Sequence, residues 1–313
     1  MLLLHLSDVD EERWAKNLGE LLGDYPLVRQ NERFDPEQVR YIFVWKPLEN
    51  AFDGLTNLKA ILSLGAGVDA LLKHENLPRN VPIVRFTDNQ LTQCMSDYVV
   101  ANVTMHQRCF SRYQNDQQLG NWTQFYPPPA WDISVGIMGL GVLGHDAAKR
   151  LIALGFTVNG WSRSAKQIKG ARIFCGAGQF DDFLGQSDIL VNLLPLTAQT
   201  ENILNYRTFS KLRRTRLNGG PAIINAARGG HQNENDIARA LSDKTLGAAS
   251  LDVFNIEPLP KDSALWGLKN CYITPHIAAI SNPENGAAYF ARVLTGHENG
   301  KPLINVVDVE KGY

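Results

Sequence analysis

The sequence predicts an α/β protein built from two Rossmann-like domains. Strand-like apolar runs alternate with helical stretches along the chain, which is typical of βαβ units and parallel sheets. The alternation stops at a proline-rich segment, residues 125–131, and then begins again. The chain of 313 residues is also too long for one small core, so two domains are expected.

The first series of elements predicts a flavodoxin-like substrate domain. Its strands are expected at Leu2–Leu6, Tyr41–Trp45, Ala60–Leu64 and Ile83–Phe86. A helix is expected at Glu11–Leu22, between two of these strands. One long helical stretch, roughly Thr92 to Leu119, follows the series and leads to the proline-rich loop.

The second series predicts a doubly wound dinucleotide-binding domain inserted within the first. Its strands are expected at Ile133–Met138, Thr157–Ser162, Asp188–Leu194, Ala222–Asn225, Ala248–Val253 and Cys271–Thr274. A last helix, about Pro283–Asn299, is expected to pack on the first domain. Residues 1–98 plus 284–313 would then form the substrate domain, and residues 99–283 the cofactor domain. An active site is expected in the cleft between them.

Composition bounds the functional class. The net charge of -1 argues against a nucleic-acid partner, because phosphate contacts need a basic excess. The four cysteines are scattered, so neither a metal site nor a disulfide framework is expected, and a cytoplasmic location fits best. The apolar N-terminus soon meets Asp8 and is expected to be a strand rather than a signal peptide. No apolar run approaches the ~18 residues that a membrane span needs.

A glycine-rich turn predicts the cofactor site. Gly139, Gly141 and Gly144 follow a short apolar strand and precede a helical stretch. Such glycines allow a tight turn and let the backbone approach a pyrophosphate, which the N–H groups around Val142 and Leu143 would bind. The alternative is a purely structural turn, which a fingerprint between a strand and a helix disfavours.

The end of the next strand predicts NADPH rather than NADH. An NAD site usually has an acidic residue there, bonding the ribose 2′-hydroxyl. Ser162 occupies that position, Arg163 follows it, and Lys166 is close. A hydroxyl can donate to a 2′-phosphate and an arginine can pair with it. The alternative is that these cations are solvated and the enzyme is indifferent to the cofactor.

Three short sequence motifs, each following an apolar strand, predict the chemistry. Arg228 has the planar fork that suits the carboxylate and carbonyl oxygen of a 2-oxo acid. His276 can protonate the alkoxide that forms when hydride attacks the ketone. Glu257 is expected to raise the His276 pKa and keep the ring a competent acid near neutral pH. Each residue alone would more often be structural, but their joint occurrence after a dinucleotide turn favours catalysis.

Several motifs resemble the D-isomer-specific 2-hydroxyacid dehydrogenase family, most closely its bacterial glyoxylate/hydroxypyruvate reductases of the A type. The resemblance covers nearly the whole chain. The matching motifs are Leu62–Asp69, Trp161–Arg163, Leu193–Thr197, Leu251–Phe254, Glu257–Pro260 and the terminal Lys311–Tyr313.

The resemblance implies further roles. Trp45 would line the substrate pocket, and backbone N–H groups of Ala66, Gly67 and Val68 would bind the substrate carboxylate. Asp252 would lie by the nicotinamide carboxamide. The remaining implied cofactor contacts are Leu194, Pro195, Ala226, Arg228 and His276. A homodimer built largely on the cofactor domains is also implied.

Two segments depart from the family pattern. The loop 211–220 is longer and more basic than usual, and it is expected to be solvated on the face away from the cofactor. Asp97 is the acidic residue in what is expected to be a helix start at 94–98, and its role stays open.

The sequence thus predicts NADPH-dependent reduction of small 2-oxo acids, glyoxylate and hydroxypyruvate first. The alternatives are a dehydrogenase for a bulkier 2-oxo acid and, from another class, a cofactor-binding regulator on the same fold.

Overall fold

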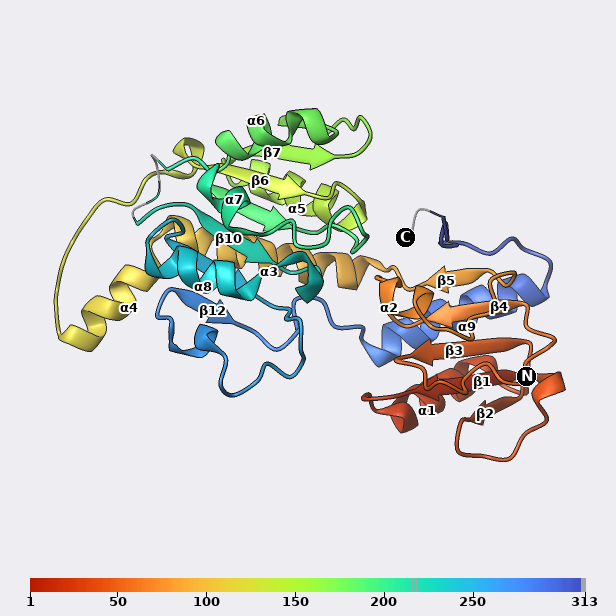
Figure 1. Ribbon diagram of the computed structural model, residues 1–313. Coiled ribbons are helices and arrows are strands. Elements are labelled where there is room, and N and C mark those ends of the chain that lie inside the picture. The colour runs from red at the N-terminus through yellow and green to blue at the C-terminus, as the bar shows by residue number, and fades with distance from the viewer. Residues whose placement is uncertain (215–216, 218, 311–313) are drawn as a thin grey trace. The chain divides into compact units, whose positions relative to one another are not determined.

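The computed structural model describes residues 1–214, 217 and 219–310 (Figure 1). Its contacts divide the chain into two compact units, Met1–Leu91 with the segment from Ser281 onward, and Thr92–Ile280. The first boundary falls inside helix α3 (Asn89–Gln107), as does the boundary expected after residue 98. The second falls a few residues before the expected position after residue 283. The family-like ending Lys311–Tyr313 lies outside the described residues.

The first unit contains a five-stranded parallel sheet of order β2-β1-β3-β4-β5. This is the flavodoxin-like order, so the predicted fold of this unit is confirmed. The strands are β1 (Leu2–Leu6), β2 (Leu27–Arg29), β3 (Tyr41–Trp45), β4 (Ala60–Ser63) and β5 (Ile83–Arg85). The helices are α1 (Glu11–Leu22), η1 (Pro36–Gln38), α2 (Asp69–Leu72) and α9 (Pro283–Glu298).

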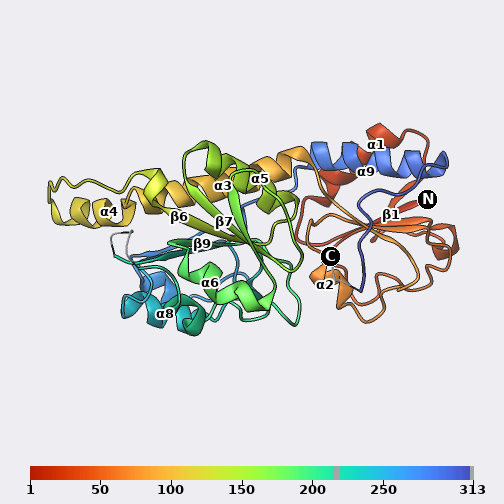
Figure 2. The same cartoon turned by 90° about the horizontal axis from the view of Figure 1, so that it is seen from above.

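Helices α1 and α9, which come from opposite ends of the chain, lie side by side in this unit (Figure 2). Gly286 of α9 makes the approach possible, because a Cβ there would lie 2.2 Å from the Trp14 ring of α1. Trp14, Phe43 and Phe290 are buried and pack edge to face or tilted against one another. The C-terminal helix therefore completes the core of the first unit, as the sequence predicted.

The second unit contains a seven-stranded parallel sheet of order β12-β11-β10-β9-β6-β7-β8. Counted from β6, this is the doubly wound dinucleotide-binding order with one added edge strand, and it confirms the predicted class. The strands are β6 (Ser134–Met138), β7 (Thr157–Ser162), β8 (Ala171–Cys175), β9 (Ile189–Asn192), β10 (Ala222–Asn225), β11 (Ala248–Leu251) and β12 (Cys271–Ile273). The sequence predicted all of these strands except β8.

Helices cover both faces of this sheet (Figures 1 and 2). Besides α3 they are α5 (Val142–Ala153), α6 (Phe180–Gly185), α7 (Tyr206–Ser210) and α8 (Glu234–Ser242), and the unit also contains α4 (Phe110–Leu119). Short turns of 3₁₀ helix are η2 (Ala130–Asp132), η3 (Ala177–Gln179), η4 (Gly229–His231) and η5 (Ala264–Gly267). Among the described residues, no helix is long and apolar enough to cross a membrane.

The single helix predicted over roughly 92–119 is wrong, because two helices occupy this stretch. Cys109 separates them with a left-handed φ of 56°. Val99 and Val103 of α3 are fully buried, whereas α4 buries none of its residues. In Figure 1, α4 and the loop after it extend away from the rest of this unit. Apolar periodicity could not locate the break, since α4 has no core to face.

The helix start expected at 94–98 is also wrong, since α3 already begins at Asn89. Asp97 lies inside α3 and forms an ion pair with Arg150 of α5 at 3.0 Å. The acidic residue therefore ties two helices of the second unit together.

The basic loop 211–220 is anchored rather than simply solvated, so that expectation is corrected for its described part. Arg213 forms an ion pair with Asp188, whose side chain is fully buried. Lys211 pairs with Asp181, and Arg214 donates to the Thr245 carbonyl oxygen at 3.0 Å. Asp188 and Arg213 lie before the strands begin, at the amino edge of the sheet. Residues 215, 216 and 218 of the loop lie outside the described residues.

Candidate active site

The predicted catalytic residues follow three neighbouring strands at the carboxyl edge of the seven-stranded sheet. Arg228 comes three residues after β10, Glu257 comes six after β11, and His276 comes three after β12. In an open parallel sheet these ends meet at one edge, where ligands bind. The structure thus places the three residues after adjacent strands of one sheet, and it brings Glu257 and His276 into direct contact.

The glycine-rich turn has the geometry of a dinucleotide fingerprint. Gly139 has a φ of +93°, and a Cβ there would lie 2.6 Å from the Leu193 carbonyl oxygen. A Cβ at Gly144 would lie 1.9 Å from the Gly139 carbonyl oxygen, so this glycine permits close packing of helix and strand. Around Gly141, by contrast, a Cβ would meet no described atom within 4 Å. That open position is where a pyrophosphate would approach the backbone.

Helix α5 begins directly after this open position. Its N-cap is Gly141, which offers no side chain to bond the first N–H groups, including those of Val142 and Leu143. The helix has twelve residues, so its aligned peptide dipoles favour an anion at this end. The turn therefore fits the pyrophosphate of a dinucleotide.

The end of β7 carries the residues predicted to choose the cofactor. Ser162 is buried and donates its hydroxyl proton to the Ser164 carbonyl oxygen at 2.7 Å. Arg163 and Lys166 are exposed. The Cys175 thiol lies 3.2 Å from the Arg163 carbonyl oxygen and holds this turn against β8. Two exposed cations thus follow the position, held here by Ser162, where an NAD site usually carries an acidic residue.

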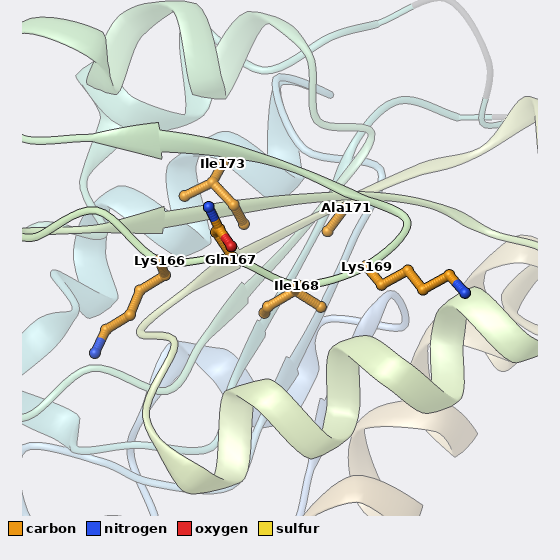
Figure 3. Close-up of a pocket in the computed structure, with 6 residues that line it drawn as sticks. All are labelled: Lys166, Gln167, Ile168, Lys169, Ala171 and Ile173. Atoms are coloured by element: carbon orange, nitrogen blue, oxygen red, sulfur yellow. The ribbon is translucent and has the colours of Figure 1, made fainter.

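A hollow of about 530 Å³ lies beside this turn, along the segment that crosses from β7 to β8. Its lining residues are Lys166, Gln167, Ile168, Lys169, Ala171 and Ile173. Lys166 and Lys169 extend in opposite directions from it (Figure 3). The hollow follows the crossover toward the start of β8 and shares only Lys166 with the predicted cofactor contacts.

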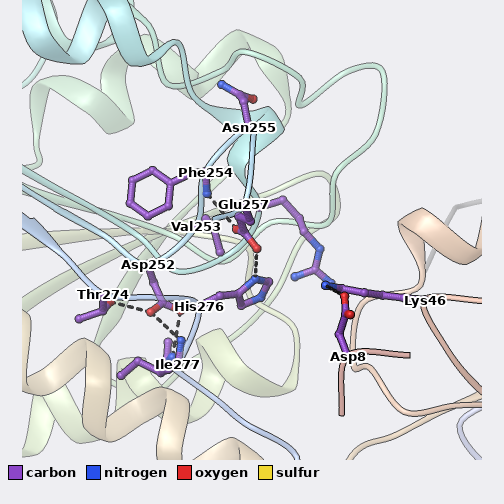
Figure 4. Close-up of polar contacts among 12 residues, drawn as sticks. Asp8, Lys46, Asp252, Val253, Phe254, Asn255, Glu257, Thr274, His276 and Ile277 are labelled. Carbon is purple, nitrogen blue, oxygen red and sulfur yellow. Dashed lines mark hydrogen bonds and ion pairs between the residues drawn. The ribbon is translucent and has the colours of Figure 1, made fainter. Parts of the chain in front are cut away.

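His276 and Glu257 form the predicted pair (Figure 4). The distance from His276 Nδ1 to Glu257 Oε2 is 2.8 Å. Glu257 Oε1 accepts from the Phe254 N–H at 3.0 Å, which fixes the carboxylate. Because Nδ1 faces the carboxylate, Nε2 is the ring nitrogen available to a substrate. A carboxylate in this position sets the tautomer and stabilises the imidazolium.

The Asp252 carboxylate anchors the turn that carries His276. It accepts from Thr274 Oγ at 2.6 Å, from the Ile277 N–H at 2.9 Å and from the Ala278 N–H at 2.9 Å (Figure 4). His276 itself has a φ of 56°, a conformation unusual for a residue other than glycine. Asp252 is 1% exposed, so its three hydrogen bonds compensate a buried charge.

Sequence analysis missed Tyr98, which reaches the same network from α3. Its hydroxyl lies 2.9 Å from Thr274 Oγ. Burial raises the pKa of Tyr98 to about 12, so it is a neutral hydrogen-bonding group at physiological pH. No local pattern marks this contact, because the two residues are 176 positions apart.

Arg228 lies in a turn held by its own backbone. Its carbonyl oxygen accepts from Asn225 Nδ2 at 3.1 Å and lies 3.2 Å from His231 Nδ1. One guanidinium nitrogen donates to the Ala227 carbonyl oxygen at 2.7 Å. The side chain is partly exposed, and its planar fork suits a carboxylate.

In the first unit, the predicted substrate residues gather after β3 and β4. The Trp45 ring lies against Gly65, where a Cβ would be 2.7 Å from the indole. Ala66 and Gly67 follow Gly65 and are partly exposed, whereas Val68 is buried at the start of α2. The indole therefore packs directly on the loop predicted to bind the substrate carboxylate.

Comparison with known proteins decides the family. The profile of the D-isomer specific 2-hydroxyacid dehydrogenase NAD-binding domain matches residues 100–278, more than half of the chain. The chain belongs to the D-isomer-specific 2-hydroxyacid dehydrogenase family. The resemblance drawn from the sequence motifs is confirmed.

Known members of the family match this chain over nearly its whole length. A glyoxylate/hydroxypyruvate reductase A of Yersinia enterocolitica is 39% identical over 97% of both chains. The structure resembles an NADPH-dependent glyoxylate/hydroxypyruvate reductase of Sinorhizobium meliloti solved with NADP and sulfate, with 39% identity, a TM-score of 0.92 and coverage of 100% and 99%. It also resembles a probable 2-hydroxyacid dehydrogenase of Rhizobium etli solved with NADP, HEPES and L(+)-tartaric acid, with 41% identity, a TM-score of 0.92 and the same coverage.

Proposed function

We propose that this chain is an NADPH-dependent reductase of small 2-oxo acids, reducing glyoxylate to glycolate and hydroxypyruvate to D-glycerate. The observation that carries the proposal is the 2.8 Å contact between His276 Nδ1 and Glu257 Oε2 in the unit that holds the dinucleotide turn. The reductase name of the Yersinia enterocolitica and Sinorhizobium meliloti relatives supports the substrate, and the NADP in the Sinorhizobium meliloti and Rhizobium etli structures supports the cofactor.

The chain's own residues supply binding and proton transfer. NADPH, when bound, supplies the hydride that reaches C2 of the 2-oxo acid. Arg228 bonds the substrate carboxylate and the adjacent carbonyl oxygen, which orients the ketone and stabilises the charge that develops on it. His276 Nε2 gives its proton to that oxygen, so the C=O bond becomes C–OH. Glu257 keeps the ring oriented and stabilises the imidazolium before transfer.

The preference for NADPH rests on Arg163 and Lys166. A 2′-phosphate at the end of β7 would meet two cations, and Ser162 could turn its hydroxyl from Ser164 to the phosphate. We expect Arg163→Ala to lower kcat/KM for NADPH roughly 10- to 30-fold, as loss of a charge-assisted contact would, and to leave kcat/KM for NADH nearly unchanged. Steady-state assays with both cofactors decide this; equal losses would contradict it.

Trp45 favours a small acid. Its indole rests on Gly65, beside the loop 66–68 proposed to bind the carboxylate through N–H groups. A large ring at this place leaves less room for the 2-oxo acid side chain. The alternative, a bulkier substrate, would be favoured by a smaller side chain at this position. Trp45→Ala is expected to improve phenylpyruvate relative to glyoxylate.

A homodimer belongs to the same proposal. The segment α4 and its loop carry exposed apolar side chains of unusual size for a surface. They are Phe110, Leu119, Trp122, Tyr126 and Trp131. A projecting segment of this kind suits contact with a second copy.

All four cysteines are free, which fits a reducing compartment, and we infer a cytoplasmic location.

A steady-state panel tests the function. Glyoxylate, hydroxypyruvate, pyruvate and phenylpyruvate would be assayed with NADPH and with NADH. We expect glyoxylate and hydroxypyruvate, with NADPH, to give the highest kcat/KM. A clear preference for phenylpyruvate would favour the bulkier-acid alternative, and absence of turnover with every acid would favour a cofactor-binding regulator.

A further inference from the structure

A chain of three buried side-chain amides lies under the candidate active site. Asn192 ends β9, Asn225 ends β10, and Gln232 follows the turn that carries Arg228. All three are 0% exposed. Buried amides are costly unless their hydrogen bonds are made, so their partners define what they do.

The amides donate in one direction across the sheet. Asn192 Nδ2 donates to Asn225 Oδ1 at 3.0 Å, and Asn225 Nδ2 donates to Gln232 Oε1 at 2.8 Å. Gln232 Nε2 then donates to the Val253 carbonyl oxygen at 2.8 Å. Val253 lies in the loop after β11 that leads to Glu257. The chain thus joins the loops that follow three neighbouring strands.

Backbone contacts of the same amides hold the loops themselves. Asn192 Oδ1 accepts from the Leu194 N–H at 3.3 Å, on the loop with the proposed cofactor contacts. Asn225 Oδ1 accepts from the Ala227 N–H at 3.2 Å, and its Nδ2 also donates to the Arg228 carbonyl oxygen at 3.1 Å. The amide orientations agree with every one of these donors and acceptors.

The three amides connect the segments after β9, β10 and β11 beyond the point where the backbone hydrogen bonds of the sheet end. Asn225 pairs in register with Asn192 on one side and with Leu251 on the other. The backbone bonds beyond that pair include Asp252 N–H to the Asn225 carbonyl oxygen at 3.0 Å. Past this point the parallel backbones diverge into loops, and the side-chain amides connect them instead.

A second contact couples the Arg228 turn to the Glu257 loop. A Cβ at Gly229 would lie 2.0 Å from both the carbonyl carbon and the oxygen of Phe254. The Phe254 N–H in turn donates to Glu257 Oε1 at 3.0 Å. A shift of the Arg228 turn would therefore press on the backbone that fixes the His276 partner.

His231 joins the Arg228 turn to the cofactor-side loop. It is 0% exposed, with Nδ1 3.2 Å from the Arg228 carbonyl oxygen and Nε2 3.2 Å from the Pro195 carbonyl oxygen. The ring thus spans the loops after β9 and β10, the same pair that Asn192 and Asn225 connect.

We propose that Asn192, Asn225 and Gln232 are positioning residues that set the distance between Arg228 and the Glu257–His276 pair. The inference rests on the proposed function, since it concerns where a 2-oxo acid is held relative to its proton donor. A misplacement of about 1 Å costs on the order of 100-fold in rate, so a rigid connection beneath the site matters to catalysis.

Gln232→Met tests the proposal with little change in volume. It removes both amide bonds, and we expect KM for glyoxylate to rise about 10-fold and kcat to fall about 10-fold. The Kd for NADPH, measured by fluorescence quenching, should stay within about threefold, because the glycine turn is untouched. These expectations correspond to partial loss of substrate orientation.

Asn159→Leu is the matched control. Asn159 is a buried amide of β7 that donates to Ser134 Oγ at 2.8 Å and to the Gln186 carbonyl oxygen at 3.0 Å, near the amino edge. It should lower Tm as much as Gln232→Met does and leave KM and kcat of the folded protein unchanged. Equal kinetic losses in both variants would show that the three buried amides only stabilise the fold, and this result would overturn the proposal.

Gln232→Glu supplies a rescue that a stability role alone does not predict. A protonated glutamic acid can donate to the Val253 carbonyl oxygen and accept from Asn225, as the amide does. Its kcat/KM relative to wild type should therefore rise as pH falls, while the ratio for Gln232→Met stays flat. Unfolding of both Gln232 variants, or a flat ratio in both, would overturn the proposal.

The wild-type assay separates the two levels of inference. If wild type turns over neither glyoxylate nor hydroxypyruvate with NADPH, the proposed function fails. If wild type is active and Gln232→Met has wild-type KM and kcat, only the positioning inference fails.

Discussion

Buried polar groups serve different purposes at the two edges of the seven-stranded sheet. At the amino edge, Asp188 accepts from the Ser134 N–H at 2.8 Å and pairs with Arg213. At the carboxyl edge, the amides of Asn225 and Gln232 hold loops whose outer side chains remain partly exposed. The amino edge closes the strands of the sheet with a charge pair. At the carboxyl edge neutral amides hold the Arg228 turn, and the buried Asp252 carboxylate holds only the His276 turn.

The difference shows how one sheet separates stability from chemistry. The hydrogen bonds that Arg213 donates to the Asp188 carboxylate raise the pKa of the guanidinium above its ordinary value, so the charge of Arg213 is satisfied within the protein. At the other edge the neutral amides order the loops without adding a charge to compete for an anionic substrate. The side chains proposed for function lie in the loops that follow the strands, and the sheet itself holds these loops in place.

The largest expected effect separates two arginines, one at each edge. Arg228→Gln should lower kcat/KM for glyoxylate roughly 100- to 1000-fold, because a fork of charge-assisted hydrogen bonds to the substrate is lost. Arg213→Gln should leave kcat/KM of the folded enzyme within about twofold. Steady-state kinetics of both variants check this, and a comparable loss in Arg213→Gln would break the distinction between the edges.

The next effect concerns stability alone. Asp188→Asn removes the charge that compensates Arg213, and about 2 kcal/mol of stability should be lost, less than for a fully buried pair because Arg213 is 29% exposed. For a unit of this size the loss corresponds to a fall in Tm of roughly 4–8 °C. Thermal unfolding followed by circular dichroism measures it. An unchanged Tm would show that the amino edge does not depend on this pair.

A smaller effect concerns the interior between the edges. His106 of α3 is buried with Nε2 2.9 Å from Ser250 Oγ of β11, and burial lowers its pKa to about 4. The neutral ring therefore contributes stability that is present above the unfolded pKa of about 6.5 and is lost as pH falls toward 4. The loss between pH 7 and pH 5 should be at most about 2 kcal/mol.

His106→Phe isolates that contribution. Denaturant titrations of wild type and variant at both pH values would give the difference in free energy of unfolding. We expect a flatter pH dependence in the variant, with kcat unaffected since His106 lies away from the loops that carry the site. An identical pH dependence in the two proteins would assign the acid sensitivity to other groups.

Periodic sequence patterns predicted most of the strands and the turn that binds the cofactor in the proposed function. Periodicity located every strand of the two sheets except β2 and β8, and the glycine spacing located the turn before α5. The sequence could single out Arg228, Glu257 and His276 as the proposed catalytic trio because each stands in a short motif after an apolar strand. The strand β8 was missed because charged and partly exposed residues such as Arg172 interrupt its apolar pattern.

Contacts that join distant segments were not predictable. Tyr98 and Thr274 meet only because α3 passes beneath the β12 loop, and the Asp188–Arg213 pair gives no local signal. The break at Cys109 was hidden because polar residues on both sides suit an exposed helix. The amide chain escaped notice for a similar reason, since a lone asparagine at a strand end resembles an ordinary turn residue.

In the proposed mechanism, His276 donates the proton from the carboxyl edge. The single-turnover rate of NADPH oxidation at saturating glyoxylate, in wild type and in His276→Ala, tests this role most directly. We expect a rate about 1000-fold lower in the variant, in the range that loss of a general acid produces, with an unchanged Kd for NADPH. A rate within tenfold of wild type would contradict it and remove His276 as the acid.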